Sequence, residues 1–209
     1  YKILECPDMK VWIVNARHIK YVPGHKTDKK DSAWICKLLL AGLLKPSYIP
    51  EREQRELRDL TRYRNKLIQH VSSEKNRIVR ILEDCNIKLS SVVCSLDGVV
   101  ANKLIDMLID KGHVTMDDIT CIYHKKLEAS PELLYQACEG FIEPHHIYML
   151  QTIRKDMEQT KAIIADLTCR IKEVLSPYEN VMELLQKIPG LSRKTVEDLI
   201  AEIGVDMEA

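Results

Sequence analysis

The longest regular pattern of apolar residues lies in residues 51–84, where apolar side chains recur in steps close to a heptad. The members of this pattern are Leu57, Leu60, Leu67, Val71, Ile78 and Ile81. Residues 145–175 carry a second pattern, made by Leu150, Ile153, Met157, Thr160, Ile164, Leu167, Ile171 and Val174. Two long apolar seams of similar length predict two helices that pair as an antiparallel coiled-coil hairpin. An ordinary helical bundle is the alternative.

Shorter patterns precede and separate these two helices. The run VWIVN, residues 11–15, predicts a buried strand because it is short and apolar. After a Pro-Gly break, apolar positions at helical spacing predict a helix to about Leu44, with Thr27 or Asp28 as its N-cap. Residues 86–144 predict short helices that cap the hairpin, and no chemical motif is assigned to them.

Residues 182–204, MELLQKIPGLSRKTVEDLIAEIG, predict two short helices joined by a Pro-Gly turn. We expect the first helix to end at Ile188 and Ser192 to cap the second. The spacing is similar to a helix-hairpin-helix, in which the glycine permits close backbone approach and the exposed amides of the second helix hold a DNA phosphate. The candidate phosphate-binding residues are Gly190, Ser192, Arg193 and Lys194. A plain helical hairpin is the alternative.

The formal net charge is zero, yet the charges are unevenly distributed. Residues 1–80 carry 18 Lys+Arg and 9 Asp+Glu, and the remainder carries 13 and 22. A basic first part favours a polyanionic partner, whereas the alternative is that the basic part packs against the acidic part. The candidate nucleic-acid contacts in this part are Arg17, His18, Lys20, Lys26, Lys29, Lys30, Arg62 and Arg64.

The seven cysteines form no CxxC pair, which favours an intracellular compartment. No signal peptide and no apolar run long enough to span a bilayer is found in the sequence. The pair His145-His146 has no Cys or acidic partner at ligand spacing, so a position at a helix start is favoured over a metal site.

Asp28 and Asp31 are the candidate catalytic and metal-binding residues. Their spacing places both carboxylates on one helix face. Carboxylate oxygens suit Mg²⁺ or Mn²⁺, and two such ions can support phosphodiester chemistry. Spacing alone favours the alternative, in which aspartates in a first turn meet the helix dipole favourably.

Residues 11–68, VWIVNARHIKYVPGHKTDKKDSAWICKLLLAGLLKPSYIPEREQRELRDLTRYRNKLI, resemble the transposases of the IS110 insertion-sequence family. Residues 188–207, IPGLSRKTVEDLIAEIGVDM, resemble the start of that family's C-terminal transposase domain. The resemblance implies a RuvC-like domain of the RNase H fold with four acids in the order D-E-D-D. The KTDxxD segment supplies the last two acids, which map onto Asp28 and Asp31 and imply Mg²⁺ or Mn²⁺ as the cofactor.

The resemblance also implies what the protein does. Members transpose DNA by strand cleavage and exchange, with a structured guide RNA, in the cytoplasm of a prokaryote at its nucleoid, and their subunits assemble through the coiled coil as homo-oligomers. We expect the chain to be a fragment, with the first Asp and the Glu upstream of Tyr1 and the nucleophilic serine beyond Ala209. Ser192 does not match that serine. Catalysis by this chain alone is therefore not expected, and its metal binding is expected to be weak or absent.

The expected fold is mostly α, with three parts. Residues 1–50 form the C-terminal part of a RuvC-like α/β domain, and 51–178 form the coiled-coil hairpin with its insert. Residues 179–209 begin the C-terminal domain with the helix-hairpin-helix-like motif. We expect the apolar side chains of VWIVN to be poorly covered by the rest of the chain. The alternatives to a transposase are a non-catalytic coiled-coil interaction protein and a stand-alone DNA-binding module.

Overall fold

A computed structural model describes residues 10–16, 28–124, 127 and 129–205. It is mostly helical and divides into two compact units, Tyr1–Arg55 and Glu56–Ala209.

The first unit is built around helix α2, Asp28–Leu40. The helix ends four residues earlier than the apolar pattern predicts because Gly42 adopts a left-handed conformation, with φ of 68°. The amide of Gly42 donates to the carbonyl of Leu39 over 3.0 Å, and that of Leu43 donates to Leu38 over 2.9 Å. These bonds close the last turn in the way a left-handed residue commonly ends a helix.

The prediction of a buried strand at residues 11–15 is wrong for the described chain. The segment forms one isolated antiparallel bridge, between Val14 and Pro46. Proline has no amide hydrogen to donate, so a ladder cannot extend through Pro46. Trp12 and Ile13 remain 38% and 45% exposed, which agrees with the expectation of poor coverage. No strand, and hence no RNase H-like sheet, is present among the described residues of this unit.

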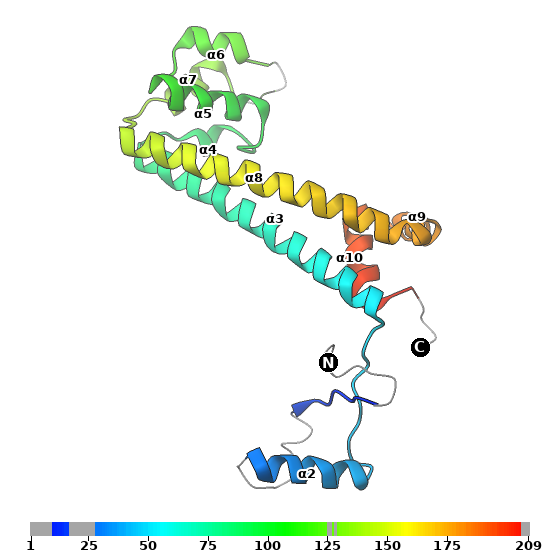
Figure 1. The fold of residues 1–209 in the computed structure, drawn as a ribbon. Helices are drawn as coiled ribbons and strands as arrows, with labels where there is room; N and C mark the ends of the chain where they lie inside the picture. The colour runs from blue at the N-terminus through cyan, green and yellow to red at the C-terminus, as the bar shows by residue number, and fades with distance from the viewer. Residues whose placement is uncertain (1–9, 17–27, 125–126, 128, 206–209) are drawn as a thin grey trace. The chain divides into compact units, whose positions relative to one another are not determined.

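The second unit contains the two long helices that the apolar seams predict, α3 (Arg52–Asp84) and α8 (Pro144–Leu175). They lie side by side and run in opposite directions (Figure 1). Helix α8 begins at a capping box formed by Glu143 and His146, with Pro144 in its first turn, where a missing amide hydrogen costs nothing. His145 and His146 therefore occupy the helix start, as the sequence indicates.

The seam between α3 and α8 is apolar at both ends. Ile78 and Leu82 of α3 share a buried cluster with Leu150 and Ile153 of α8. At the other end, Leu57 is buried with the last turns of α8. Polar side chains also occupy buried positions of α3, and an apolar pattern does not reveal them. These residues are Thr61, Arg64 and Glu74.

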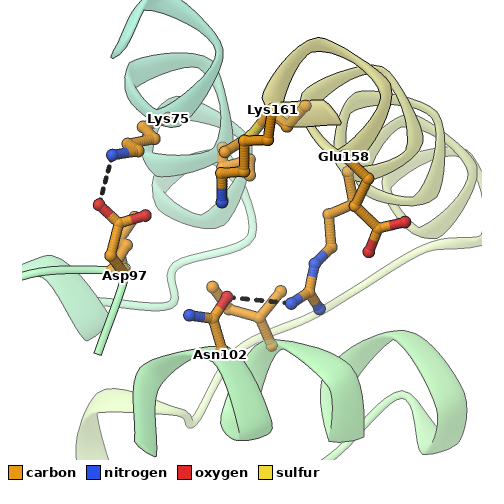
Figure 2. A pocket seen from close by; sticks show the side chains of 10 residues that line it. Lys75, Asp97, Asn102, Glu158 and Lys161 are labelled. Atoms are coloured by element: carbon orange, nitrogen blue, oxygen red, sulfur yellow. Dashed lines mark hydrogen bonds and ion pairs between the residues drawn. The ribbon is translucent and has the colours of Figure 1, made fainter. Parts of the chain in front are cut away.

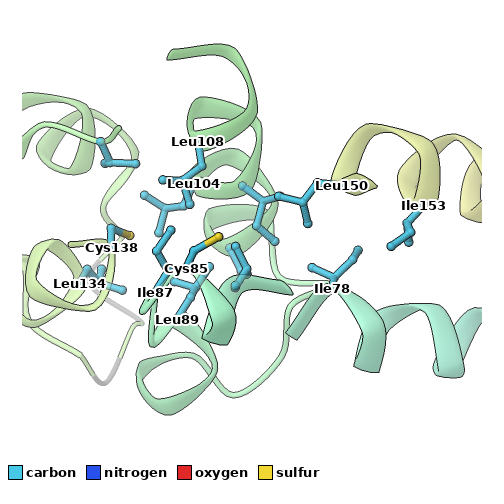
Figure 3. Packing of buried hydrophobic residues seen from close by; sticks show 14 of the residues in the cluster. Ile78, Cys85, Ile87, Leu89, Leu104, Leu108, Leu134, Cys138, Leu150 and Ile153 are labelled. Atoms are coloured by element: carbon cyan, nitrogen blue, oxygen red, sulfur yellow. The ribbon is translucent and has the colours of Figure 1, made fainter. Parts of the chain in front are cut away.

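The insert between the two arms forms the helical cap that the sequence predicts. Its helices are α4 (Leu89–Val92), α5 (Val99–Lys111), α6 (Met116–Ile122) and α7 (Pro131–Ala137). Figure 3 shows Cys85 and Ile87, at the end of α3, among the buried side chains of α5 and α7. Gly140 lies against this junction, and the amide of Phe141 donates to the carbonyl of Cys85 over 2.9 Å. The cap is therefore fixed to the tip of the hairpin by apolar packing and backbone bonds.

The C-terminal segment consists of a short 3₁₀ turn, η1 (Ser176–Tyr178), and two helices, α9 (Glu179–Gln186) and α10 (Arg193–Ile203). Ser192 caps α10 as predicted, because its hydroxyl accepts a hydrogen bond from the amide of Thr195. Helix α9 ends two residues before the predicted Ile188. Val196, Ile200 and Ala201 of α10 are buried in one cluster with Leu57, Ile171, Leu175 and Met182.

Candidate nucleic-acid and metal-binding sites

The two candidate catalytic aspartates lie in the first turn of α2. The helix begins at Asp28, and Asp31 follows three residues later on the same face. Asp31 is exposed. The side chains of Asp28, Lys29 and Lys30 lie outside the described structure, as do the whole of residues 17–27. The proposed contacts Arg17, His18, Lys20 and Lys26, and the candidate cap Thr27, fall in that range.

The chemistry of this pair fits a hard divalent cation in part. Mg²⁺ prefers oxygen ligands in an octahedral arrangement and binds proteins through one or two carboxylates together with water and phosphate. Asp28 and Asp31 can supply two carboxylates from one turn of helix. They would leave most of the octahedron of such an ion to other ligands, so this pair alone could not complete a Mg²⁺ site.

Arg62 and Arg64, the other predicted phosphate contacts, bond to carboxylates of helix α10. Arg62 donates two hydrogen bonds to the carboxylate of Glu202, over 2.7 and 2.8 Å. Arg64 donates to Glu197 over 2.5 Å and to Asp198 over 3.1 Å, and the Arg64 side chain is 3% exposed. Arg64 is enclosed by the protein and cannot reach a phosphate in this conformation.

Arg58 completes this contact between the two helices. Its Nε donates to the carbonyl of Ala201 over 2.9 Å, and its Nη2 donates to the carbonyl of Glu202. We call Arg58, Arg62 and Arg64 the arginine clamp. The second explanation of the charge asymmetry, packing of basic on acidic residues, therefore holds for the clamp.

The clamp changes the acid–base properties of α10. The hydrogen bond from Arg62 holds the pKa of Glu202 below its ordinary value. Burial acts to raise the pKa of Asp198, but hydrogen bonds from Lys194, Asn65 and Arg64 outweigh it and lower that pKa. Sequence reasoning missed this network because Arg64 and Glu197 are 133 residues apart. The available signal was an arginine within the apolar seam, between Leu60 and Leu67.

The helix-hairpin-helix-like segment has an open turn and paired cations. Gly190 has φ of 89°, and a Cβ there would meet nothing within 4 Å. Arg193 donates to both carboxylate oxygens of Glu179, over 2.7 and 2.9 Å, which raises its pKa. Lys194 donates to Asp198 over 2.8 Å. Both cations that the sequence assigned to phosphate binding thus lie against carboxylates, whereas the space beside Gly190 is free.

A hollow of about 120 Å³ lies between α3, α5 and α8 (Figure 2). Its lining includes the cations Lys75, Arg154 and Lys161 together with apolar side chains. Lys75 is paired with Asp97, and Arg154 donates to Asn102 over 3.0 Å and to Asp106. Because these carboxylates offset the cations of the lining, the hollow has little excess positive charge, and we assign it no ligand.

No helix in the described part of the chain is both long and apolar enough to cross a membrane.

Comparison with known families bears on the first part of the chain. Residues 1–87 match a family model described as "Transposase", the DEDD domain of the IS110 type. The match contains Asp28, Asp31 and the whole of α3. No curated protein and no solved structure matches the chain. Over residues 1–87 the chain is therefore similar to the DEDD transposases of IS110-type insertion sequences.

Proposed function

We propose that this chain is the DNA-handling part of an IS110-type transposase, which in its complete form transposes DNA by strand cleavage and exchange. The observation that carries the proposal is the family match over residues 1–87, within which two aspartates lie one turn apart at the start of α2. A DNA substrate follows from the transposase family. A structured RNA guide is part of the proposal and rests on the resemblance.

Asp28 and Asp31 are proposed as the last two acids of the four-acid site. With the family's other two acids they would hold Mg²⁺ or Mn²⁺, and a bound ion would supply charge stabilisation at a phosphodiester. Asp31 is exposed, so its carboxylate is accessible to an ion and to a phosphate. Two carboxylates fix an octahedral ion poorly, so cleavage is proposed to require the remaining acids.

The nucleic-acid surface is proposed to lie on the basic segment around α2. The residues assigned to it are Arg17, His18, Lys20, Lys26, Lys29 and Lys30. The arginine clamp is not included, because α10 carboxylates and carbonyls already bind its guanidinium groups. The start of α10 is retained as a weaker contact through backbone amides, since the amides of a first helical turn lack partners within the helix.

The hairpin is proposed to act as an arm that carries the cap and the C-terminal helices. The apolar seams of α3 and α8 bury each other within one chain. A homo-oligomer that used the same seams would have to open the hairpin, so assembly is proposed to use its outer faces. We also propose that α3 and α8 pack against each other with coiled-coil geometry.

Binding to nucleic acid across a salt series tests this function. Fluorescence anisotropy of labelled duplex DNA and of a structured RNA, with the full chain, measures the affinity at each salt concentration. Phosphate contacts predict a linear fall of log K with log salt, amounting to about 10³-fold between roughly 50 and 200 mM for six contacts. Absence of binding to both probes at the lowest salt would overturn the proposal and favour a non-catalytic interaction protein.

A further inference from the structure

A group of three potential metal ligands lies in the middle of the hairpin, in the second unit and outside the DEDD segment around α2. His70 and Glu74 lie one turn apart on α3, and Asp156 faces them from α8. The Nε2 atom of His70 and the Oδ2 atom of Asp156 are 2.7 Å apart. One ligand atom from each of the three residues lies within 4.8 Å of the other two.

The position of Glu74 sets this group apart from an ordinary surface ion pair. Glu74 is 4% exposed and occupies the buried stripe of α3 between Val71 and Ile78, where an apolar residue would be expected. Its carboxylate lies close to that of Asp156, and two like charges in a partly buried place repel each other strongly. A buried carboxylate that faces a second carboxylate is costly unless a cation balances both.

The cation paired with Glu74 comes from the same helix. Arg77 lies 3.1 Å from Glu74, one turn along α3, and the Arg77 side chain is 59% exposed. This pair does not connect α3 to α8. Within the group, the neighbours of the Glu74 carboxylate are the imidazole of His70, on the same helix, and the carboxylate of Asp156, which faces it from α8.

We propose that His70, Glu74 and Asp156 bind a divalent transition-metal ion of the Zn²⁺ type that links α3 to α8. One imidazole and two carboxylates are ligands that Zn²⁺ accepts, and three protein ligands leave a fourth position for water. An imidazole ligand disfavours Mg²⁺, which prefers oxygen. Ligand atoms around a tetrahedral Zn²⁺ lie roughly 3.4 Å apart, given bond lengths of about 2.1 Å, so small side-chain rotations bring the group to this spacing.

The ion has a mechanical consequence for the hairpin. It offsets the charges of Glu74 and Asp156 and joins the two arms at a point between the apolar ends of the seam. Binding to the folded state alone stabilises it by mass action. The proposal is independent of the transposase assignment, because neither the family match nor the α2 aspartates enter it.

Titration with Co²⁺, a spectroscopic substitute for Zn²⁺, tests the site in the full chain under reducing conditions. The absorption of Co²⁺ distinguishes nitrogen and oxygen ligands from thiolate, which matters because exposed cysteines such as Cys94 and Cys169 can also bind. We expect one ion bound without thiolate absorption and a higher melting temperature on binding. His70→Gln and Asp156→Asn should each weaken this binding at least tenfold.

Matched variants control for general effects. His145→Gln and Asp166→Asn remove exposed side chains of α8 outside the group and should leave Co²⁺ binding unchanged. Glu74→Gln removes the buried charge, so the metal-free protein should stay folded while the rise in melting temperature is lost. Equal Co²⁺ affinity in the wild type, His70→Gln and Asp156→Asn would mean an adventitious ion only and would overturn the proposal.

Discussion

Arg64 in α3 and Glu197 in α10 form a buried ion pair, with Nη1 and Oε2 2.5 Å apart and both side chains 3% exposed. The pair joins the C-terminal helix to the end of the hairpin. The Nε atom of Arg64 is buried without a hydrogen-bond partner. Such a pair is costly to break from one side, because the remaining charge stays buried.

Removal of one partner should therefore be far more harmful than removal of both. Glu197→Leu is expected to lower the free energy of unfolding by about 3–5 kcal/mol, since Arg64 loses its closest counter-charge. The double variant Arg64→Met with Glu197→Leu should recover most of that loss, because two apolar side chains fill the same space. Urea unfolding followed by circular dichroism measures both values.

An exposed pair provides the control for this cycle. Arg170 and Glu173 lie 3.0 Å apart on α8 with side chains about two-thirds exposed. Glu173→Gln should change the free energy of unfolding by less than about 1 kcal/mol, as is usual for surface pairs. If Glu197→Leu behaved like Glu173→Gln, the clamp would not hold α10 in place.

The contact between Arg62 and Glu202 should make stability depend on acid pH. The pKa of Glu202 is lowered in the folded protein, so its contribution is present above the ordinary value of 4.5 and is lost as pH falls through the lower folded pKa. Glu202→Gln should therefore flatten the acid side of the stability profile, measured by urea unfolding from about pH 6 to pH 3.

Some acid dependence should persist in Glu202→Gln. The hydrogen bond from Lys111, followed by those from Thr115, lowers the pKa of Asp118 strongly. Glu183→Gln, which removes an exposed carboxylate of α9, is the matched control and should leave the wild-type profile in place. Identical profiles for Glu202→Gln and the wild type would show that Arg62 does not stabilise the charged form of Glu202.

Gly140 should not accept a side chain at the tip of the hairpin. A Cβ there would overlap the carbonyl oxygen of Cys85 and approach Cγ1 of Ile87 to 2.6 Å. Because a backbone atom cannot move aside cheaply, Gly140→Ala is expected to cost at least about 2 kcal/mol of unfolding free energy. Gly98→Ala, where the nearest atom lies 3.2 Å from the Cβ, should cost less than about 1 kcal/mol in the same measurement. Equal costs would contradict the close approach.

Gly190→Ala tests whether the open turn before α10 meets DNA. The turn has a positive φ and free space around it, so the substitution adds backbone strain of about 1–2 kcal/mol and a methyl group that would block close approach. We expect weaker binding of duplex DNA in fluorescence anisotropy. Gly112→Ala is the matched control, because Gly112 also has a positive φ, 74°, but caps α5. A similar DNA affinity in both variants would assign Gly190 to the turn alone.

The long helices could be predicted from the sequence because their bounds depend on local spacing. Apolar residues in steps of three and four placed α3 and α8 within one residue of their observed starts, and Ser192 identified the start of α10. The prediction of a strand at VWIVN was wrong because a strand must pair with a neighbouring segment. The described chain forms one isolated bridge there, to Pro46. A local sequence pattern does not show which distant segment, if any, a strand pairs with.

The candidate site was predictable to a smaller extent, for the same reason. The position of Asp28 and Asp31 on one helical turn followed from spacing. Arg64 was assigned to phosphate because few acids lie near it in sequence, whereas Glu197 reaches it from a helix 133 residues away. Charge counts along a chain therefore overestimate the charge that remains available on its surface.

The central claim is that the basic segment around α2 binds nucleic acid, and charge reversal within that segment tests it most directly. The double variant Lys29→Glu with Lys30→Glu is compared with a second double variant, Lys103→Glu with Lys172→Glu. The second variant changes the net charge by the same amount, at exposed residues of the acidic part of the chain. Anisotropy with duplex DNA should show a large loss of affinity and a shallower salt dependence for the first variant only. Equal losses in the two variants, or none in either, would contradict the account.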